Sequence, residues 1–170
     1  MKTKVIPLIV ILLLILSTTA AIGAGHTKTK GIISFAPTGF LSGSYNIGYE
    51  MPLDNTNSIK GFGSFFYYSA GTESVSGFGA GAQYRYYTEN KAPEGFYVGP
   101  SGSFTSFEGV SLFAIGGVGG YQWIFEDTYT IDGYVGANYY LGSYDMGSEF
   151  DSYSFSGFVP SYGLSLGYKF

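Results

Sequence analysis

The chain has 170 residues, no cysteine, a formal net charge of −4, 19% aromatic residues and only 12% charged residues. This length suits one domain, and the aromatic content argues against disorder. The lack of cysteine excludes disulfides and thiolate metal sites, and the acidic balance argues against nucleic-acid binding. An ordinary soluble domain has roughly twice this charged fraction.

The N-terminus has the pattern of a secretory signal peptide. Lys2 and Lys4 precede the apolar run Val5–Leu16, and Ala21-Ile22-Gly23 resembles a small-x-small cleavage site. The alternative is an uncleaved anchor, but the apolar run is shorter than the about 20 residues that a spanning helix needs. The predicted division is residues 1–23 as signal peptide and residues 24–170 as one β-barrel domain.

After this segment, short runs of alternating apolar and polar residues recur between turn sequences, and no amphipathic helical pattern is present. This pattern predicts an all-β chain with eight strands. The expected strands are Lys30–Pro37, Phe40–Met51, Ile59–Tyr68, Gly77–Thr88, Gly95–Phe104, Leu112–Phe125, Tyr129–Leu141 and Gly157–Phe170.

The predicted connections differ in character. Compact turn sequences at 52–58, 89–94 and 126–128 would lie at one end of an up-and-down barrel, together with both chain ends. The other end would carry the short link 38–39 and the looser segments 69–76, 105–111 and 142–156. Short inner turns and longer outer loops are typical of outer-membrane barrels, and the short first outer loop fits that pattern only partly.

Most predicted strands have one face of small or polar residues and one apolar face. In the second strand Asn46 and Glu50 alternate with Tyr45 and Ile47. A soluble lipocalin-type barrel has its apolar residues inside. Charged residues that share a face with Gly and Ser favour a membrane barrel with a polar lumen instead. The third and sixth strands carry apolar residues on both faces and do not decide their orientation.

Four charged residues fall on the predicted inner faces, near the same end of the barrel: Glu50, Arg85, Asp132 and Lys169. An isolated buried ion is costly by several kcal/mol, so these two acids and two bases should pair in one network. The network is interpreted as a structural plug that fixes strand register, or as a gated ion path. The plug is favoured because an eight-stranded barrel is only wide enough to be filled by side chains.

Aromatic residues gather near both predicted ends of the strands. Rows of Tyr and Trp at membrane interfaces are typical of outer-membrane barrels. The alternative is a soluble β-protein with scattered strand aromatics. The predicted girdle at the inner end consists of Tyr49, Tyr84, Tyr86, Phe96, Trp123 and Tyr129, and aromatics near the outer end are Phe40, Phe66, Phe78, Phe104, Phe113, Tyr139 and Phe158.

The last strand carries a family resemblance. Its apolar face holds Tyr162, Leu164, Leu166, Tyr168 and the terminal Phe170, which resembles the C-terminal signature of bacterial outer-membrane β-barrels. The resemblance implies an eight-stranded antiparallel transmembrane barrel in the bacterial outer membrane. It also implies that the barrel-assembly machinery recognises this strand.

A second stretch resembles the same group. Tyr84-Arg-Tyr-Tyr87 followed by Gly95-Phe-Tyr-Val-Gly-Pro100 is similar to a hairpin of small barrels like the OmpA transmembrane domain and OmpX, and of uncharacterised outer-membrane barrel families. Such families imply a monomer in outer-membrane lipid with a structural or surface-interaction role and no assigned reaction.

Catalytic and cofactor signals are weak. His26 is the only histidine and builds no catalytic constellation, and no metal or cofactor motif is complete. Asp145, Glu149 and Asp151 form an acidic loop that would bind a hard cation or simply be solvated. We therefore expect an outer-membrane barrel without catalysis. The alternatives are a soluble lipocalin-like barrel that binds a small apolar ligand and, third, an outer-membrane enzyme.

Overall fold

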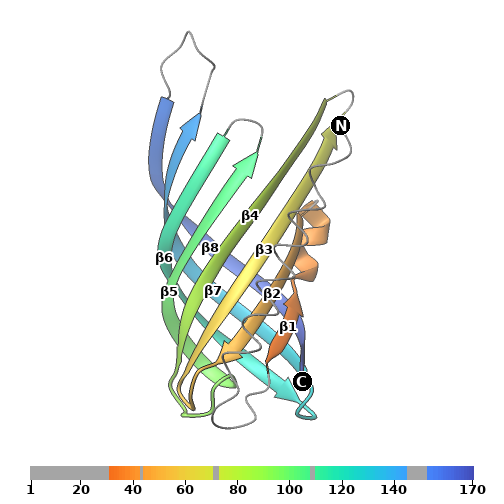
Figure 1. Ribbon diagram of the computed structural model, residues 1–170, viewed down its shortest axis with the longest axis vertical. Helices are drawn as coiled ribbons and strands as arrows, with labels where there is room; N and C mark the ends of the chain where they lie inside the picture. The colour runs from red at the N-terminus through yellow and green to blue at the C-terminus, as the bar shows by residue number, and fades with distance from the viewer. Residues whose placement is uncertain (1–30, 43, 71–72, 108–109, 145–152) are drawn as a thin grey trace.

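The computed structural model describes residues 31–42, 44–70, 73–107, 110–144 and 153–170. They form a closed barrel in which each strand pairs with the next and β1 pairs with β8, all antiparallel (Figure 1). The predicted all-β, eight-stranded, up-and-down barrel is confirmed. The strands are β1 (Ile32–Phe35), β2 (Ser44–Pro52), β3 (Asn57–Ala70), β4 (Glu73–Tyr87), β5 (Gly95–Phe107), β6 (Val110–Phe125), β7 (Tyr129–Tyr144) and β8 (Tyr153–Lys169).

Three short connections lie at one end of the barrel, which we call the turn end. They are residues 53–56, 88–94 and 126–128, close to the predicted turns. Asp54 holds the first of them, because its carboxylate accepts hydrogen bonds from the backbone N–H groups of Thr56, at 2.7 Å, and Asn57, at 2.8 Å. The opposite end, where β3, β5 and β7 end and β4, β6 and β8 begin, we call the loop end.

The strands extend further towards the loop end than the sequence predicts. β4 begins at Glu73 and β5 continues to Phe107, so most of the expected loops 69–76 and 105–111 is strand. Backbone hydrogen bonding between strands does not require apolar side chains. These stretches therefore continue the ladder although their sequences lack the alternation of apolar and polar residues that predicts a strand. The predicted acidic loop residues Asp145, Glu149 and Asp151 lie outside the described residues, as do His26 and the predicted signal peptide.

β1 is the exception, because it is shorter than predicted. It covers four residues, and the chain then turns into the short 3₁₀ helix η1 (Pro37–Ser42). The prediction that Phe40 begins the next strand is therefore wrong. Pro37 favours this outcome, because its ring fixes φ at a helical value and its missing N–H is not needed in a first helical turn.

A notch in the barrel wall follows from the short β1. The last residue of β1, Phe35, pairs with Leu166 of β8 and with Ile47 of β2. Within the described part of the chain, β8 has no strand partner on this side for residues 153–165. We call the space between this part of β8 and η1 with the start of β2 the notch. It lies on the loop-end side of β1 (Figure 1).

The two faces of the barrel differ in polarity. Outward-facing apolar side chains are exposed, such as Val135 at 67% and Phe158 at 79%. Inward-facing charged side chains are buried, with Glu50 and Arg85 both at 0%. Among the described residues, no helix is long and apolar enough to cross a membrane.

Candidate functional site in the barrel lumen

Four charged residues from four strands meet inside the barrel near the turn end. In the strand register Glu50 of β2 lies opposite Lys60 of β3, and Arg85 of β4 lies two positions from Gln83, the partner of Lys60. Asp132 of β7 approaches from the other wall. Because side chains alternate along a strand, these positions all point inward.

The four residues form a continuous chain of ion pairs, which we call the lumen network. Arg85 Nη1 lies 3.0 Å from Glu50 Oε2, and Arg85 Nη2 lies 2.9 Å from Asp132 Oδ2. Lys60 Nζ lies 2.8 Å from the same Asp132 oxygen. Two acids and two bases balance, so the network buries no formal net charge.

Neutral side chains complete the hydrogen bonding of both carboxylates. Tyr87 donates to Glu50 Oε1 at 2.6 Å, as does Ser58 at 2.5 Å, and Tyr97 donates to Asp132 Oδ1 at 2.7 Å. Every carboxylate oxygen of the network thus accepts at least one hydrogen bond. This arrangement satisfies the condition under which buried ions are tolerated.

Arg85 is held on its remaining sides as well. Its Nε and Nη2 donate to Gln83 Oε1 at 3.1 and 2.8 Å, and its guanidinium carbon lies 4.1 Å from the centre of the Tyr97 ring. A guanidinium above an aromatic face gains a cation–π attraction. Arg85 is therefore the centre of the network, with contacts to β2, β5 and β7.

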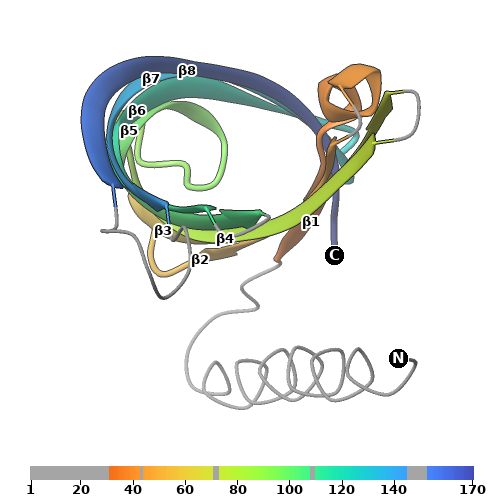
Figure 2. The same ribbon diagram turned by 90° about the horizontal axis from the view of Figure 1, so that it is seen from above.

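The β4–β5 turn lies across the lumen (Figure 2). Gln122 Nε2 donates to the carbonyl oxygen of Pro93 at 2.5 Å, and the backbone N–H of Ala92 donates to Asn55 O at 2.8 Å. Ala92 also packs against the buried cluster of Tyr87, Tyr97 and Val118. Side chains and this turn together fill the lumen at the turn end.

The structure brings three of the four predicted network residues together and separates the fourth. Lys169 shares the inner face of β8, but it pairs with Asp127 in the β6–β7 turn at the edge of the barrel. The Lys169 side chain is 17% exposed and that of Asp127 69%. The prediction that Lys169 belongs to the network is therefore wrong. Lys169 is the last residue of its strand, level with the turns.

Lys60 takes the place predicted for Lys169. Sequence reasoning missed it because β3 has aromatic or apolar residues on both faces. A signal was present in the hairpin register: Met51 and Ile59, which flank the predicted turn, are partners, and this places Lys60 opposite Glu50. Tyr87, Tyr97, Gln83 and Gln122 were missed as well, since uncharged residues give no such constraint.

The predicted girdle residues all lie on strands near the turn end. Tyr84, Tyr86, Phe96, Trp123 and Tyr129 are 42–56% exposed, and Tyr49 is half-buried. They are continuous with the C-terminal strand, because Tyr49 packs 6.3 Å from Phe170 and Tyr129 packs 6.2 Å from Tyr168 between ring centres.

The residues of the predicted assembly signal face outward as expected. Tyr162 is 83% exposed, Leu164 39%, Tyr168 52% and Phe170 52%, and Leu166 is half-buried between neighbouring strands. At the loop end Phe78, Phe104, Phe113 and Phe158 are also exposed. Phe66 differs, because it alternates with the exposed Phe65 and Tyr67 and so belongs to the inner face of β3.

The lumen network offers little to a reaction. Both carboxylates are ion-paired and hydrogen-bonded, so neither is available as an acid, base or ligand without breaking the network. No group of three or more His, Cys, Asp and Glu side chains able to hold a metal occurs among the residues with described positions. The arrangement is typical of a structural plug.

No protein-family model matches this chain, and no curated protein is significantly similar to it. The resemblance to small outer-membrane barrels therefore stays a prediction from the two sequence stretches.

Proposed function

We propose that this chain is an integral β-barrel protein of the bacterial outer membrane, with a structural or surface-interaction role and a lumen closed at its turn end. The observation that carries the proposal is the inverted polarity of the barrel. Lys60, Arg85 and Asp132 are buried inside, at 6%, 0% and 1% exposure, whereas Ile47 and Val135 are 65% and 67% exposed outside.

This polarity is unfavourable in water and favourable in a bilayer. Removing apolar surface from water contributes about 25 cal/mol per Å², and the outer face of this barrel would gain that only against lipid. The soluble alternative, a lipocalin-like barrel, keeps its apolar residues inside for the same reason. The strand ladder pairs the backbone N–H and C=O groups of neighbouring strands, as hydrocarbon requires of a spanning structure, and among the described residues the β1 side of β8 at 153–165 is the exception.

The two aromatic rows support the same proposal. The girdle near the turn end contains Tyr and Trp, whose apolar rings and polar tips suit a membrane interface. The exposed Phe78, Phe104, Phe113 and Phe158 lie towards the loop end. Tyr168 and Phe158 are ten positions apart on one face of β8, which corresponds to roughly 23 Å along the barrel axis for a strand tilted by about 45°, close to the height of the apolar band in outer-membrane barrels.

The proposal includes partners and excludes catalysis. The partners are outer-membrane lipid and, during biogenesis, the barrel-assembly machinery, which would read Tyr162, Leu164, Leu166, Tyr168 and Phe170. The barrel would act as a monomer without cofactor, nucleic acid or substrate turnover. Hydrolysis of lipid or peptide by the refolded barrel would overturn the last point.

The test uses the single tryptophan, Trp123, which is 45% exposed on the outer face. The mature chain is refolded into phosphatidylcholine vesicles with and without bromine on the acyl chains. We expect the brominated lipid to quench Trp123 strongly, and the folded barrel to migrate differently on a denaturing gel before and after heating. A chain that stays folded and monomeric in buffer without detergent, with Trp123 unquenched, would instead support the soluble alternative.

A further inference from the structure

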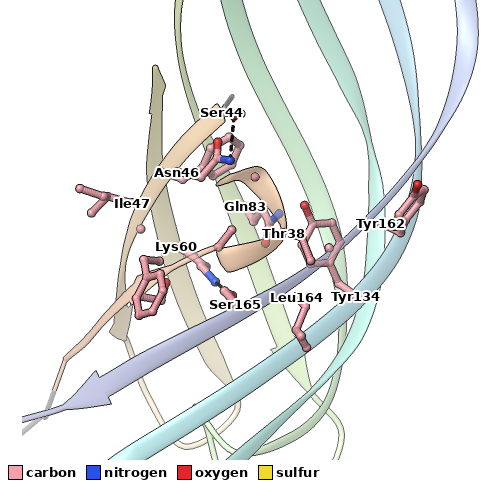
Figure 3. A pocket seen from close by; sticks show the side chains of 17 residues that line it. Thr38, Ser44, Asn46, Ile47, Lys60, Gln83, Tyr134, Tyr162, Leu164 and Ser165 are labelled. Carbon is pink, nitrogen blue, oxygen red and sulfur yellow. Dashed lines mark hydrogen bonds between the residues drawn. The ribbon is translucent and has the colours of Figure 1, made fainter. Parts of the chain in front are cut away.

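A cavity of about 380 Å³ opens at the notch (Figure 3). Its lining comes from β1, η1, β2, β3, β4, β7 and β8, so it connects the lumen to the outer face of the barrel through the wall. This volume lies within the usual range of small-molecule sites and matches roughly a dozen water-sized atoms.

The edge of β8 at the notch is unsuited to a further strand. The backbone N–H of Phe170 donates to Gly31 O, on the β1 side of β8, and alternate residues of a strand direct their hydrogen-bonding groups to the same side. Pro160 lies an even number of positions from Phe170 and therefore belongs to this edge. Proline has no N–H to donate, and edge strands use it to prevent pairing. This favours an open notch over one filled by a β-strand of another molecule.

The inner part of the cavity is polar. Asn46, Gln83 and Ser165 line it, together with Tyr134 and the Lys60 ammonium group (Figure 3). Lys60 Nζ lies 3.3 Å from Ser165 Oγ at the floor of the cavity. A polar group that reaches this floor would meet amide, hydroxyl and ammonium groups.

The margin of the same cavity is apolar and faces outward. Tyr162 and Leu164 of β8 form one side, at 83% and 39% exposure. Ile47 of β2 and Phe35 of β1 form another, at 65% and 45% exposure. An occupant that spans the cavity from floor to margin must therefore be polar at one end and apolar at the other.

The charge of the floor selects among such occupants. Lys60 is the only Lys or Arg of the lining, and Asp132, which is 2.8 Å from its Nζ, already balances it. The lumen network as a whole has no net charge. An anionic head group would have to compete with Asp132, whereas an uncharged hydroxyl group can bond to Ser165, Asn46 or Gln83 without breaking an ion pair.

We propose that the notch binds a single-chain amphiphile with an uncharged, hydroxyl-bearing head group, of the monoacylglycerol type. The head lies on the polar floor above the lumen network, and the acyl chain leaves between β8 and η1 into the bilayer. This inference rests on the proposed function, because the notch faces lipid only if the barrel is in a membrane. Since the turn end is filled, the site holds the amphiphile and does not pass it through the barrel.

The test places a fluorescent reporter in the lumen. In a Trp123→Phe background, Tyr134→Trp puts an indole on the cavity wall of the mature chain in phosphatidylcholine vesicles. A monoacylglycerol with a brominated chain is added at increasing mole fraction. We expect saturable quenching that brominated phosphatidylcholine does not reproduce. Quenching that rises linearly with mole fraction, equally for both lipids, would mean contact with bulk lipid only and would overturn the proposal.

A matched pair of variants tests the location. Asn46→Phe fills the cavity from β2 and should weaken the saturable quenching at least fivefold. Ser103→Phe adds the same ring to the inner face of β5, whose residues do not line the cavity, and should leave the saturable quenching unchanged. Equal quenching in both variants would contradict the assigned site.

The unaltered chain provides a measurement that does not depend on the folding of the reporter. Its melting temperature in phosphatidylcholine vesicles should rise with unlabelled monoacylglycerol to a plateau, because a ligand that binds only the folded state stabilises it. No rise, or an equal rise for Asn46→Phe, would overturn the proposal. Failure of the membrane proposal is distinguishable, because it appears as unquenched Trp123 in brominated phosphatidylcholine before any amphiphile is added.

Discussion

The turn end and the notch differ in two respects, the completeness of the barrel wall and the filling of the lumen. At the turn end β1 continues the ladder between β2 and β8, and four charged side chains with their partners fill the lumen. At the notch η1 replaces the strand, the ladder stops, and a cavity opens between polar floor and apolar margin. Among the described residues, a complete wall and a filled lumen occur together at the turn end, and both are missing at the notch.

The largest expected effect comes from removing the centre of the filled region. Arg85→Ala leaves Glu50 and Asp132 without their shared cation, and loss of one partner from a buried ion pair typically lowers the free energy of unfolding by about 3–5 kcal/mol. Urea unfolding of the refolded barrel, followed by its heat-dependent gel migration, measures this. Lys91→Ala removes an exposed cation from the β4–β5 turn and is the control. If Arg85→Ala unfolded at the same urea concentration as the unaltered barrel, the network would not stabilise the fold.

A second pair of variants compares how much Lys60 and Lys169 each contribute to the stability of the barrel. Lys60→Met should destabilise by about 1–3 kcal/mol, because Asp132 loses one charged hydrogen bond but keeps Arg85 and Tyr97. Lys169→Met breaks only the pair with the largely exposed Asp127 and should change stability by about 0–1 kcal/mol. Both are measured by the same urea titration. The reverse order would restore Lys169 to the network in place of Lys60.

The open edge of β8 offers a sharper test of the notch. Pro160→Val restores an N–H on that edge, and one added hydrogen bond of about 0.5–1.5 kcal/mol would strengthen association between copies up to about tenfold. Sedimentation in detergent measures the dimer fraction. Val159→Pro removes an N–H on the β7 side of the same strand and should destabilise the barrel without favouring dimers. Monomeric Pro160→Val at high concentration would show that the edge is protected by something other than proline.

The smallest expected effect lies in the β2–β3 turn. Hydrogen bonds from the Asn57 side chain and the Thr56 backbone lower the pKa of Asp54 from 3.8 to about 2. A carboxyl whose folded pKa is lowered stabilises the fold above its unfolded pKa, and this contribution is lost as the pH falls towards 2. Carboxyl NMR shifts should give this midpoint, and the Thr56 amide should exchange faster with solvent over the same range. A midpoint near 3.8 would mean that the turn does not hold the carboxylate in solution.

The regular part of the fold was predictable because period-two alternation reports directly on the two faces of a strand. It placed Glu50, Arg85 and Asp132 inside and Tyr162, Leu164 and Tyr168 outside, as the structure has them. The short β1 was not predictable in the same way, because Phe35 and Phe40 read as strand residues on either side of a link. Whether Pro37 begins a helical turn there depends on contacts with β2 and β8, which a local pattern does not contain.

The lumen network was only partly predictable for a related reason. Alternation shows which face of the strand a residue occupies but not its position along the barrel axis. Lys60 and Lys169 both face inward, and they differ in this axial position. The axial position follows from register, which Met51 and Ile59 fix for the first hairpin. The partners across the lumen, such as Arg85 with Asp132, are 47 positions apart, and no sequence spacing records them.

The pairing of β1 with β8 joins the two described strands that lie furthest apart in the sequence. β1 contributes only four residues to this pairing, whereas β7 has sixteen residues paired with its neighbours. Such a join forms late, because the ends of a long chain must meet before any of its bonds are gained. The β1–β8 pairing should therefore be the last to form when the barrel folds. Under heat or pulling force, it should be the first pairing to open.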